Sequence, residues 1–92
     1  MTLAYAPRMA ISHHFFDAYS RLPKQTQSKV SNFMMKFTQD PTQTGLNYES
    51  IHNASEKNMK SLRVDDKYRA IVLKPDQGDI YLLLWVDKLF II

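Results

Sequence analysis

The chain has 92 residues, the length of one small domain, and its 45% apolar and 23% charged residues are typical of a folded protein. It contains no cysteine, which excludes a disulfide framework and a cysteine-based zinc site. The net charge of +3 permits contact with phosphate groups without requiring it. We expect a single domain over residues 1–92, with 1–7 as an N-terminal extension and 88–92 as an atypical apolar tail.

No targeting or membrane segment is visible in the sequence. Residues 1–8 lack the long apolar core of a signal peptide, and the apolar run over 80–86 is too short to span a bilayer. The lack of cysteine also suits a reducing compartment. These features predict a cytoplasmic protein without membrane contact.

The first half of the chain predicts one strand and two helices. Residues 8–12 are typical of a short strand, and Ser12 can cap a helix over 13–22. Pro23 fits the first turn of a second helix over 24–39. The apolar stripe of this second helix has spacing i, i+3, i+4, i+7 and consists of Val30, Phe33, Met34 and Phe37. Because the connection is short, the helices should form an antiparallel hairpin.

The second half predicts a polar loop and three strands. The loop covers 42–57, and its apolar residues should anchor it to the core: Leu46, Tyr48 and Ile51. Three strand-length runs follow, at 59–64, 68–74 and 79–86. Their short connections predict an antiparallel meander packed on the helices, and therefore an α+β fold.

The last two predicted strands are apolar on both faces. Strict alternation puts Ala70 and Val72 on one face and Ile71 and Leu73 on the other. In the last strand it separates two sets: Ile80, Leu82, Leu84 and Val86 from Tyr81, Leu83 and Trp85. Such a sheet needs cover on both sides. The helices can cover one face, and a partner segment would cover the other.

Local motifs in this order resemble the RelE/ParE superfamily of bacterial toxins. They are Ser-Leu-Arg-Val at 61–64, Tyr-Arg-Ala-Ile-Val at 68–72 and Tyr-Leu-Leu-Leu-Trp-Val-Asp at 81–87. A narrower resemblance is to the RelE-like domain at the N-terminus of some UvrD-type helicases. It rests on Arg-Leu-Pro at 21–23, Asn-Tyr-Glu at 47–49 and Leu-Leu-Trp-Val-Asp at 83–87.

The resemblance implies a function for the chain. RelE-type toxins are ribosome-dependent mRNA endonucleases that use arginines and lysines instead of a metal and are silenced by an antitoxin. ParE-type relatives share the fold and act on DNA gyrase, so the fold alone does not decide the activity. The nuclease branch usually follows its last strand with an arginine and a tyrosine, and the helicase-linked relatives with a His-Asp pair and a tyrosine. Here the ending is Lys-Leu-Phe-Ile-Ile at 88–92, which lacks both sets.

Two arginines are the main catalytic candidates. If 65–67 form a three-residue hairpin loop, Arg63 faces Arg69 across the strands. Like charges placed in this way are destabilising unless an anion lies between them. Guanidinium groups suit phosphate oxygens, and the resemblance aligns Arg69 with the most persistent arginine of the family. The structural alternative is that acidic neighbours, Asp65, Asp66 or Glu56, neutralise the pair.

Lys60 is the third candidate, because it matches a family lysine that helps to activate the 2′-hydroxyl. To act as a base, a lysine needs its pKa lowered by nearby cations or burial, which Arg63 and Arg69 could supply. The alternative is a solvated lysine.

The remaining polar and aromatic residues predict no cofactor or metal. His13, His14 and His52 lack a spaced set of further ligands. Trp85 could stack on bases in an exposed groove, although a core position is the commoner one. The paired methionines at 34–35 are core or interface filler.

The apolar tail predicts either an extension of the last strand or a partner contact. The partner would be an antitoxin or a second copy of the chain. Two functions follow: the toxin of a toxin–antitoxin module, acting as a metal-independent mRNA endonuclease on the ribosome, or a catalytically degenerate module that binds protein or nucleic acid.

Overall fold

The structure is a computed structural model that describes residues 8–41, 44–51, 58–74, 76–78, 80–89 and 91. The predicted N-terminal extension at 1–7 lies outside the described residues. In chain order the elements are β1 (Arg8–Ile11), α1 (His13–Ser20), α2 (Lys24–Gln39), the 3-10 helix η1 (Thr44–Leu46), β2 (Glu49–Ser50), β3 (Met59–Arg63), β4 (Tyr68–Leu73) and β5 (Ile80–Lys88). The α+β prediction is confirmed. No helix of the described part is long and apolar enough to cross a membrane.

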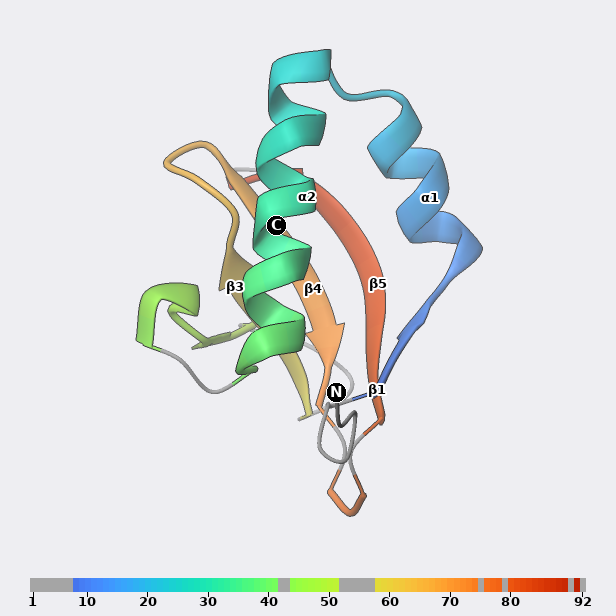
Figure 1. The fold of residues 1–92 in the computed structure, drawn as a ribbon, viewed down its shortest axis with the longest axis vertical. Helices are drawn as coiled ribbons and strands as arrows, with labels where there is room; N and C mark the ends of the chain where they lie inside the picture. Colours follow the sequence, from blue (N-terminus) through green and yellow to red (C-terminus); the bar gives the residue numbers. More distant parts are fainter. Residues whose placement is uncertain are drawn as a thin grey trace, which may run out of the picture.

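One five-stranded sheet holds all the strands, in the order β1-β5-β4-β3-β2 (Figure 1). β3, β4 and β5 form the predicted antiparallel meander. β1 runs parallel to β5 and forms the edge of the sheet opposite to β2. The first and last described strands therefore lie side by side.

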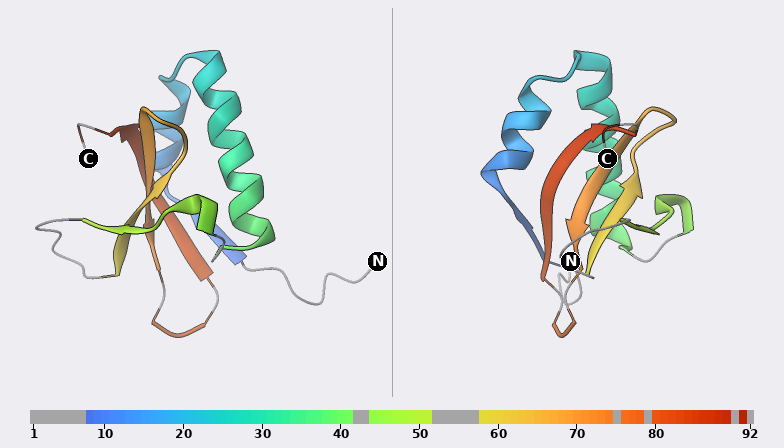
Figure 2. Two further views of the ribbon diagram at one scale, coloured as in Figure 1. Left: turned by 90° about the vertical axis from the view of Figure 1, so that its left-hand side faces the viewer. Right: turned by 180° about the vertical axis from the view of Figure 1, so that it is seen from behind.

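Both helices cover the same face of this sheet (Figure 2). The apolar stripe of α2 supplies Val30, Phe33 and Phe37, which are fully or almost fully buried. They belong to one core with Phe15 and Ala18 of α1 and with five sheet residues: Leu62, Ala70, Val72, Leu83 and Val86. No helix among the described residues covers the opposite face of the sheet, which we call the open face.

The helix boundaries follow from local chemistry. The Ser12 Oγ accepts a hydrogen bond from the Phe15 N–H at 3.3 Å, which confirms the predicted cap. α1 ends at Ser20, two residues before the predicted end at Leu22, because a residue that precedes a proline avoids the α region. Pro23 itself is the N-cap of α2, one position before the first turn that the sequence predicts.

A β-bulge in β5 corrects the predicted faces of the last strand. Ile71 pairs with Trp85 and Val72 pairs with Leu83, so Leu84 has no partner on β4. The extra residue shifts the alternation by one position. Leu83 and Val86 therefore both lie in the core, although strict alternation places them on opposite faces.

The predicted loop contains two short elements that the sequence did not indicate, η1 and β2. Leu46 of η1 is buried and anchors the segment, as predicted. Ser50 and Glu49 pair with Lys60 and Ser61 of β3. A two-residue polar strand has no period that a sequence pattern can reveal, and its pairing depends on a tertiary contact.

Candidate functional site

The predicted pairing of the two arginines is confirmed. The Val64 N–H donates to the Tyr68 carbonyl at 3.1 Å, and Arg63 stands directly opposite Arg69. Directly paired residues share a face of the sheet, and their neighbours Leu62 and Ala70 are in the core. Arg63 and Arg69 therefore both belong to the open face, which leaves the question of what compensates two like charges.

Arg69 is buried, with an exposed fraction of 7%, beneath the segment that leads into β2. Its Nε donates to the Ser61 Oγ, and its Nη2 donates to the carbonyls of Asn47 at 2.6 Å and Ser61 at 3.0 Å. The Glu49 carboxylate lies 3.8 Å from the same Nη2. The guanidinium thus holds β2 and the residues before it on β3, a structural role that needs no ligand.

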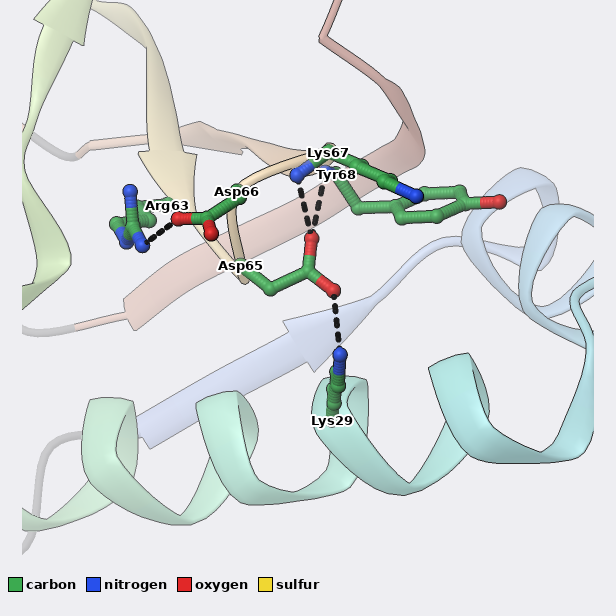
Figure 3. Close-up of polar contacts among 6 residues, drawn as sticks. All are labelled: Lys29, Arg63, Asp65, Asp66, Lys67 and Tyr68. Atoms are coloured by element: carbon green, nitrogen blue, oxygen red, sulfur yellow. Dashed lines mark hydrogen bonds and ion pairs between the residues drawn. The ribbon is translucent and has the colours of Figure 1, made fainter.

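Arg63 has a different environment, because the described pairing of β2 with β3 covers only Lys60 and Ser61 and does not reach Arg63. Its side chain is 43% exposed, and its Nη2 forms an ion pair with the carboxylate of Asp66 (Figure 3). The alternative in which acidic neighbours neutralise the two arginines is therefore confirmed in part. Asp66 compensates the charge of Arg63, and Glu49 lies beside Arg69. Glu56, the third acidic residue considered, lies outside the described residues.

Asp65 organises the hairpin loop between β3 and β4. Its Oδ1 accepts hydrogen bonds from the backbone N–H groups of Lys67 and Tyr68, each at 2.8 Å, and its Oδ2 lies 3.3 Å from Lys29 Nζ on α2 (Figure 3). Partial burial raises the pKa of Asp65, but the two backbone hydrogen bonds and Lys29 lower it by more. Asp65 is therefore held as an anion that joins the hairpin to α2.

Lys60 lies on the other face of the sheet. It pairs with Val72, a core residue, and adjacent strand residues point to opposite faces. The sheet therefore places Lys60 on the face opposite to Arg63 and Arg69, and not beside them as predicted. The preceding Lys57 and His52 lie outside the described residues.

Three further residues of the open face belong to the quoted motifs but were not predicted as site residues. Asp87 pairs with Arg69 across β4 and β5, and its Oδ2 accepts a hydrogen bond from Trp85 Nε1 at 3.2 Å. Ser61 and Glu49 contact Arg69. The pairing of Asp87 with Arg69 depends on the register between β4 and β5, which no sequence pattern indicated. The contact of Glu49 depends on β2, which the sequence analysis did not predict. Trp85 is half-buried and packs against the core cluster, so it lies at the margin of the core in which it was expected.

His13 and His14 are exposed at the start of α1, where their rings lie against each other with centroids 4.0 Å apart. Within the described part of the chain, no group of three or more His, Cys, Asp or Glu residues could hold a metal ion.

No protein-family model and no curated protein matches the sequence. Solved structures do match. A chain of the toxin–antitoxin complex RelBE2 from Mycobacterium tuberculosis has a TM-score of 0.72 and 15% identity, over 91% of this chain and 99% of that one. A chain of the archaeal RelE–RelB complex from Pyrococcus horikoshii has a TM-score of 0.71 and 16% identity, over 91% and 96%. YafQ from E. coli has a TM-score of 0.70 and 12% identity, over 92% and 96%.

The chain has the RelE-type toxin fold. The likeness covers nearly all of both chains, so the RelE-type fold accounts for the helical hairpin, the meander and the parallel first strand together. At these identities the likeness establishes the architecture and leaves the activity to be tested. The narrower resemblance to helicase-linked domains stays a prediction.

Proposed function

We propose that residues 1–92 act as a single domain, the cytoplasmic toxin of a toxin–antitoxin pair, which cleaves messenger RNA on the ribosome without a metal. The observation that carries the proposal is the RelE-type fold, which this chain shares with chains of two toxin–antitoxin complexes over 91% of its length. An antitoxin would be its protein partner.

In this proposal the reaction is an attack of a ribose 2′-oxygen on the adjacent phosphorus. The bond from phosphorus to the 5′-oxygen breaks, the 2′-hydroxyl loses its proton, and the leaving 5′-oxygen gains one. Arg63 would stabilise the negative charge that develops on the phosphate, because its guanidinium is exposed. Its ion-pair partner Asp66 is exposed as well, so a phosphate could replace the Asp66 carboxylate. Arg69 would stabilise the site indirectly, by holding β2 and the residues before it on β3. Lys60 lies on the opposite face of the sheet, so it could take part only if its side chain extended past the edge of the sheet to the open face.

Arg63 is a better probe of this proposal than Arg69. Removal of Arg69 would take away the hydrogen bonds that it donates to the carbonyls of Asn47 and Ser61 and would weaken the fold, so lost activity would have two explanations. Arg63→Gln removes only an exposed ion pair, which contributes about 0–1 kcal/mol to stability.

Primer extension on a messenger in a cell-free bacterial translation system tests the proposal. We expect ribosome-dependent cuts from the wild-type protein and cleavage slower by about 100-fold with Arg63→Gln. Arg21→Gln is the matched control, because Arg21 is exposed at the end of α1 and should cut as the wild type does. Cleavage by Arg63→Gln at the wild-type rate would remove Arg63 from the site. No cuts from a folded wild-type protein would contradict the endonuclease.

A binding module without catalysis is the second candidate function. It is favoured by the engagement of Arg69, whose Nε and Nη2 are already hydrogen-bonded within the protein. An antitoxin-like gene beside the coding sequence would favour the toxin. A helicase reading frame downstream, interrupted near the codon for Lys88, would favour the module.

A further inference from the structure

Residues 47–50 lie against Arg69 at the β3 edge of the sheet. The segment follows Leu46, which is buried in the core, and it ends in β2, which pairs with β3 through two residues. The left view of Figure 2 shows it, in green, crossing this edge from the helix side toward the open face. Arg69, which contacts it, is only 7% exposed. We call residues 47–50 the strap.

The strap reaches Arg69 through one nitrogen atom, Nη2. This atom donates to the Asn47 carbonyl at 2.6 Å and lies 3.8 Å from the Glu49 carboxylate. Two further hydrogen bonds of Arg69 go to Ser61 of β3, from Nε to the Ser61 Oγ and from Nη2 to the Ser61 carbonyl. If the strap moved away, Ser61 would still position the guanidinium, and an N–H of Nη2 would become available to a ligand.

Several features weaken the closed position of the strap. Asn47 has a φ of 49°, in the left-handed region that is unfavourable for residues with a side chain, although asparagine tolerates it better than most. The Tyr48 hydroxyl is buried and has no hydrogen-bond partner among the described residues, which costs free energy. The Tyr48 ring packs against the core and opposes opening. We therefore expect the closed and open positions to be close in free energy.

We propose that the strap masks a second phosphate-binding position, made by Arg69 and Ser61, and that RNA opens it. Both arginines of the open face are compensated when the strap is closed, Arg63 by Asp66 and Arg69 in part by Glu49. A phosphate can replace each carboxylate, because Asp66 and Glu49 are 86% and 63% exposed and exposed ion pairs are weak. Since Arg63 and Arg69 are direct partners on adjacent strands, both guanidinium groups could then hold one phosphodiester.

This regulation rests on the proposed function and deepens it. With the strap closed, Arg69 acts only by holding β2, and Arg63 is the arginine that a phosphate can reach. With the strap open, Arg69 would become a direct ligand of the phosphate.

A disulfide that holds the strap closed tests the proposal. The chain has no cysteine, and Ser50 and Lys60 are direct Cα partners on β2 and β3. Such partners lie about 4.5–5.5 Å apart, within the range of about 4.4–6.8 Å that a disulfide spans. Fluorescence anisotropy with a labelled oligouridine, without ribosomes, then compares the oxidised and reduced forms of Ser50→Cys/Lys60→Cys. We expect the oxidised form to bind about tenfold more weakly, and the comparison within one variant controls for the loss of Lys60.

Two substitutions in the strap should shift RNA binding in opposite directions. Glu49→Gln removes the carboxylate that competes with a phosphate at Arg69, so binding should become about threefold tighter. Tyr48→Phe removes the unpartnered hydroxyl and keeps the ring, so the closed strap gains stability and binding should weaken about fivefold. Asp17→Asn is the matched control for charge, because Asp17 is exposed on α1.

Equal RNA binding by the oxidised and reduced forms, or no binding by the reduced form, would overturn the proposal. So would equal gains in Glu49→Gln and Asp17→Asn, because only net charge would then matter, or unchanged binding in Tyr48→Phe. Messenger cleavage with ribosomes separates this result from the proposed function. Binding that depends on oxidation, without cleavage by the wild type, would refute the endonuclease and keep the strap. Cleavage at one rate by both redox forms would refute the strap and keep the endonuclease.

Discussion

Arg63 and Arg69 face each other on neighbouring strands, yet their surroundings differ at the level of single residues. Arg69 is buried and its donors serve the protein backbone, whereas Arg63 is exposed and its partner Asp66 is 86% exposed. A ligand phosphate needs donors that solvent can reach. We therefore assign stability chiefly to Arg69 and expect ligand contact chiefly at Arg63.

Asp65→Asn should destabilise the protein by about 1 kcal/mol at neutral pH, because the carboxylate loses its charge beside Lys29 and two backbone donors. The pKa of Asp65 is lowered in the folded state below its ordinary value of 3.8. The ionised group therefore adds stability above that value, and this contribution is lost as the pH falls through the lower, folded pKa. The difference between wild type and variant should be full at pH 7 and should shrink below about 3.8, measured by urea unfolding.

Asp66→Asn is the control for this measurement. Asp66 is exposed, so the variant should change the free energy of unfolding by less than about 0.5 kcal/mol. An equal loss in both variants, or a difference for Asp65→Asn that does not vary with pH, would contradict the role given to Asp65.

At the level of elements, the bulge in β5 and the start of α1 are joined by one side chain. Ser12 Oγ donates to the carbonyl of Leu84, the bulge residue that lacks a partner on β4, at 3.1 Å. The same oxygen accepts from the Phe15 N–H, and the Ser12 N–H donates to the Leu83 carbonyl at 2.9 Å. Ser12 therefore satisfies the helix end and the irregular strand together, which allows Leu83 and Val86 to share the core.

Ser12→Ala should lower the free energy of unfolding by about 1–2 kcal/mol, because it removes both side-chain hydrogen bonds and leaves the Leu84 carbonyl without its donor. Denaturant unfolding measures the change. Ser20→Ala is the matched control, since the Ser20 Oγ makes an exposed hydrogen bond to the Asp17 carbonyl and its loss should cost less than about 0.5 kcal/mol. Similar losses in the two variants would contradict the special role of Ser12.

For the molecule as a whole, the helices cover one face of the sheet, and β5 leads at Lys88 into the apolar tail. β5 ends at Lys88, and the described tail residues Leu89 and Ile91 lie in turns, so they do not extend the strand as one of the two predictions had it. The Leu89 N–H donates to the Lys67 carbonyl at 2.7 Å. Leu89 and Ile91 are 50% and 58% exposed, and Phe90 and Ile92 lie outside the described residues. Exposed apolar side chains that follow directly on a strand favour association.

We expect a homodimer through this tail when no antitoxin is present. Sedimentation equilibrium should show an apparent mass that rises with concentration, and Leu89→Ser/Ile91→Ser should remain a monomer. Met35→Ser is the control, because Met35 is 61% exposed on α2, away from the tail. A wild-type protein that stays monomeric at every concentration would contradict the dimer.

Local patterns determined much of this structure. The bounds of α2 agree at both ends with the prediction from its apolar stripe and its flanking prolines, and the loop at 65–67 has the predicted length. Both depend on interactions within a few residues, which a single sequence displays. For the same reason the pairing of Arg63 with Arg69 was predictable once the loop length was known.

Contacts between distant residues decided the rest. The place of β1 beside β5, the strand β2 and the bulge at Leu84 depend on partners far along the chain. Ser12 and Leu84 are 72 residues apart, and Arg69 and Asn47 are 22 apart. The environment of Arg69 followed from such a contact. Its charge and its position in the strand were readable from the sequence. Its burial depends on packing against Asn47 and Glu49, because no local period records which segment will cover a side chain.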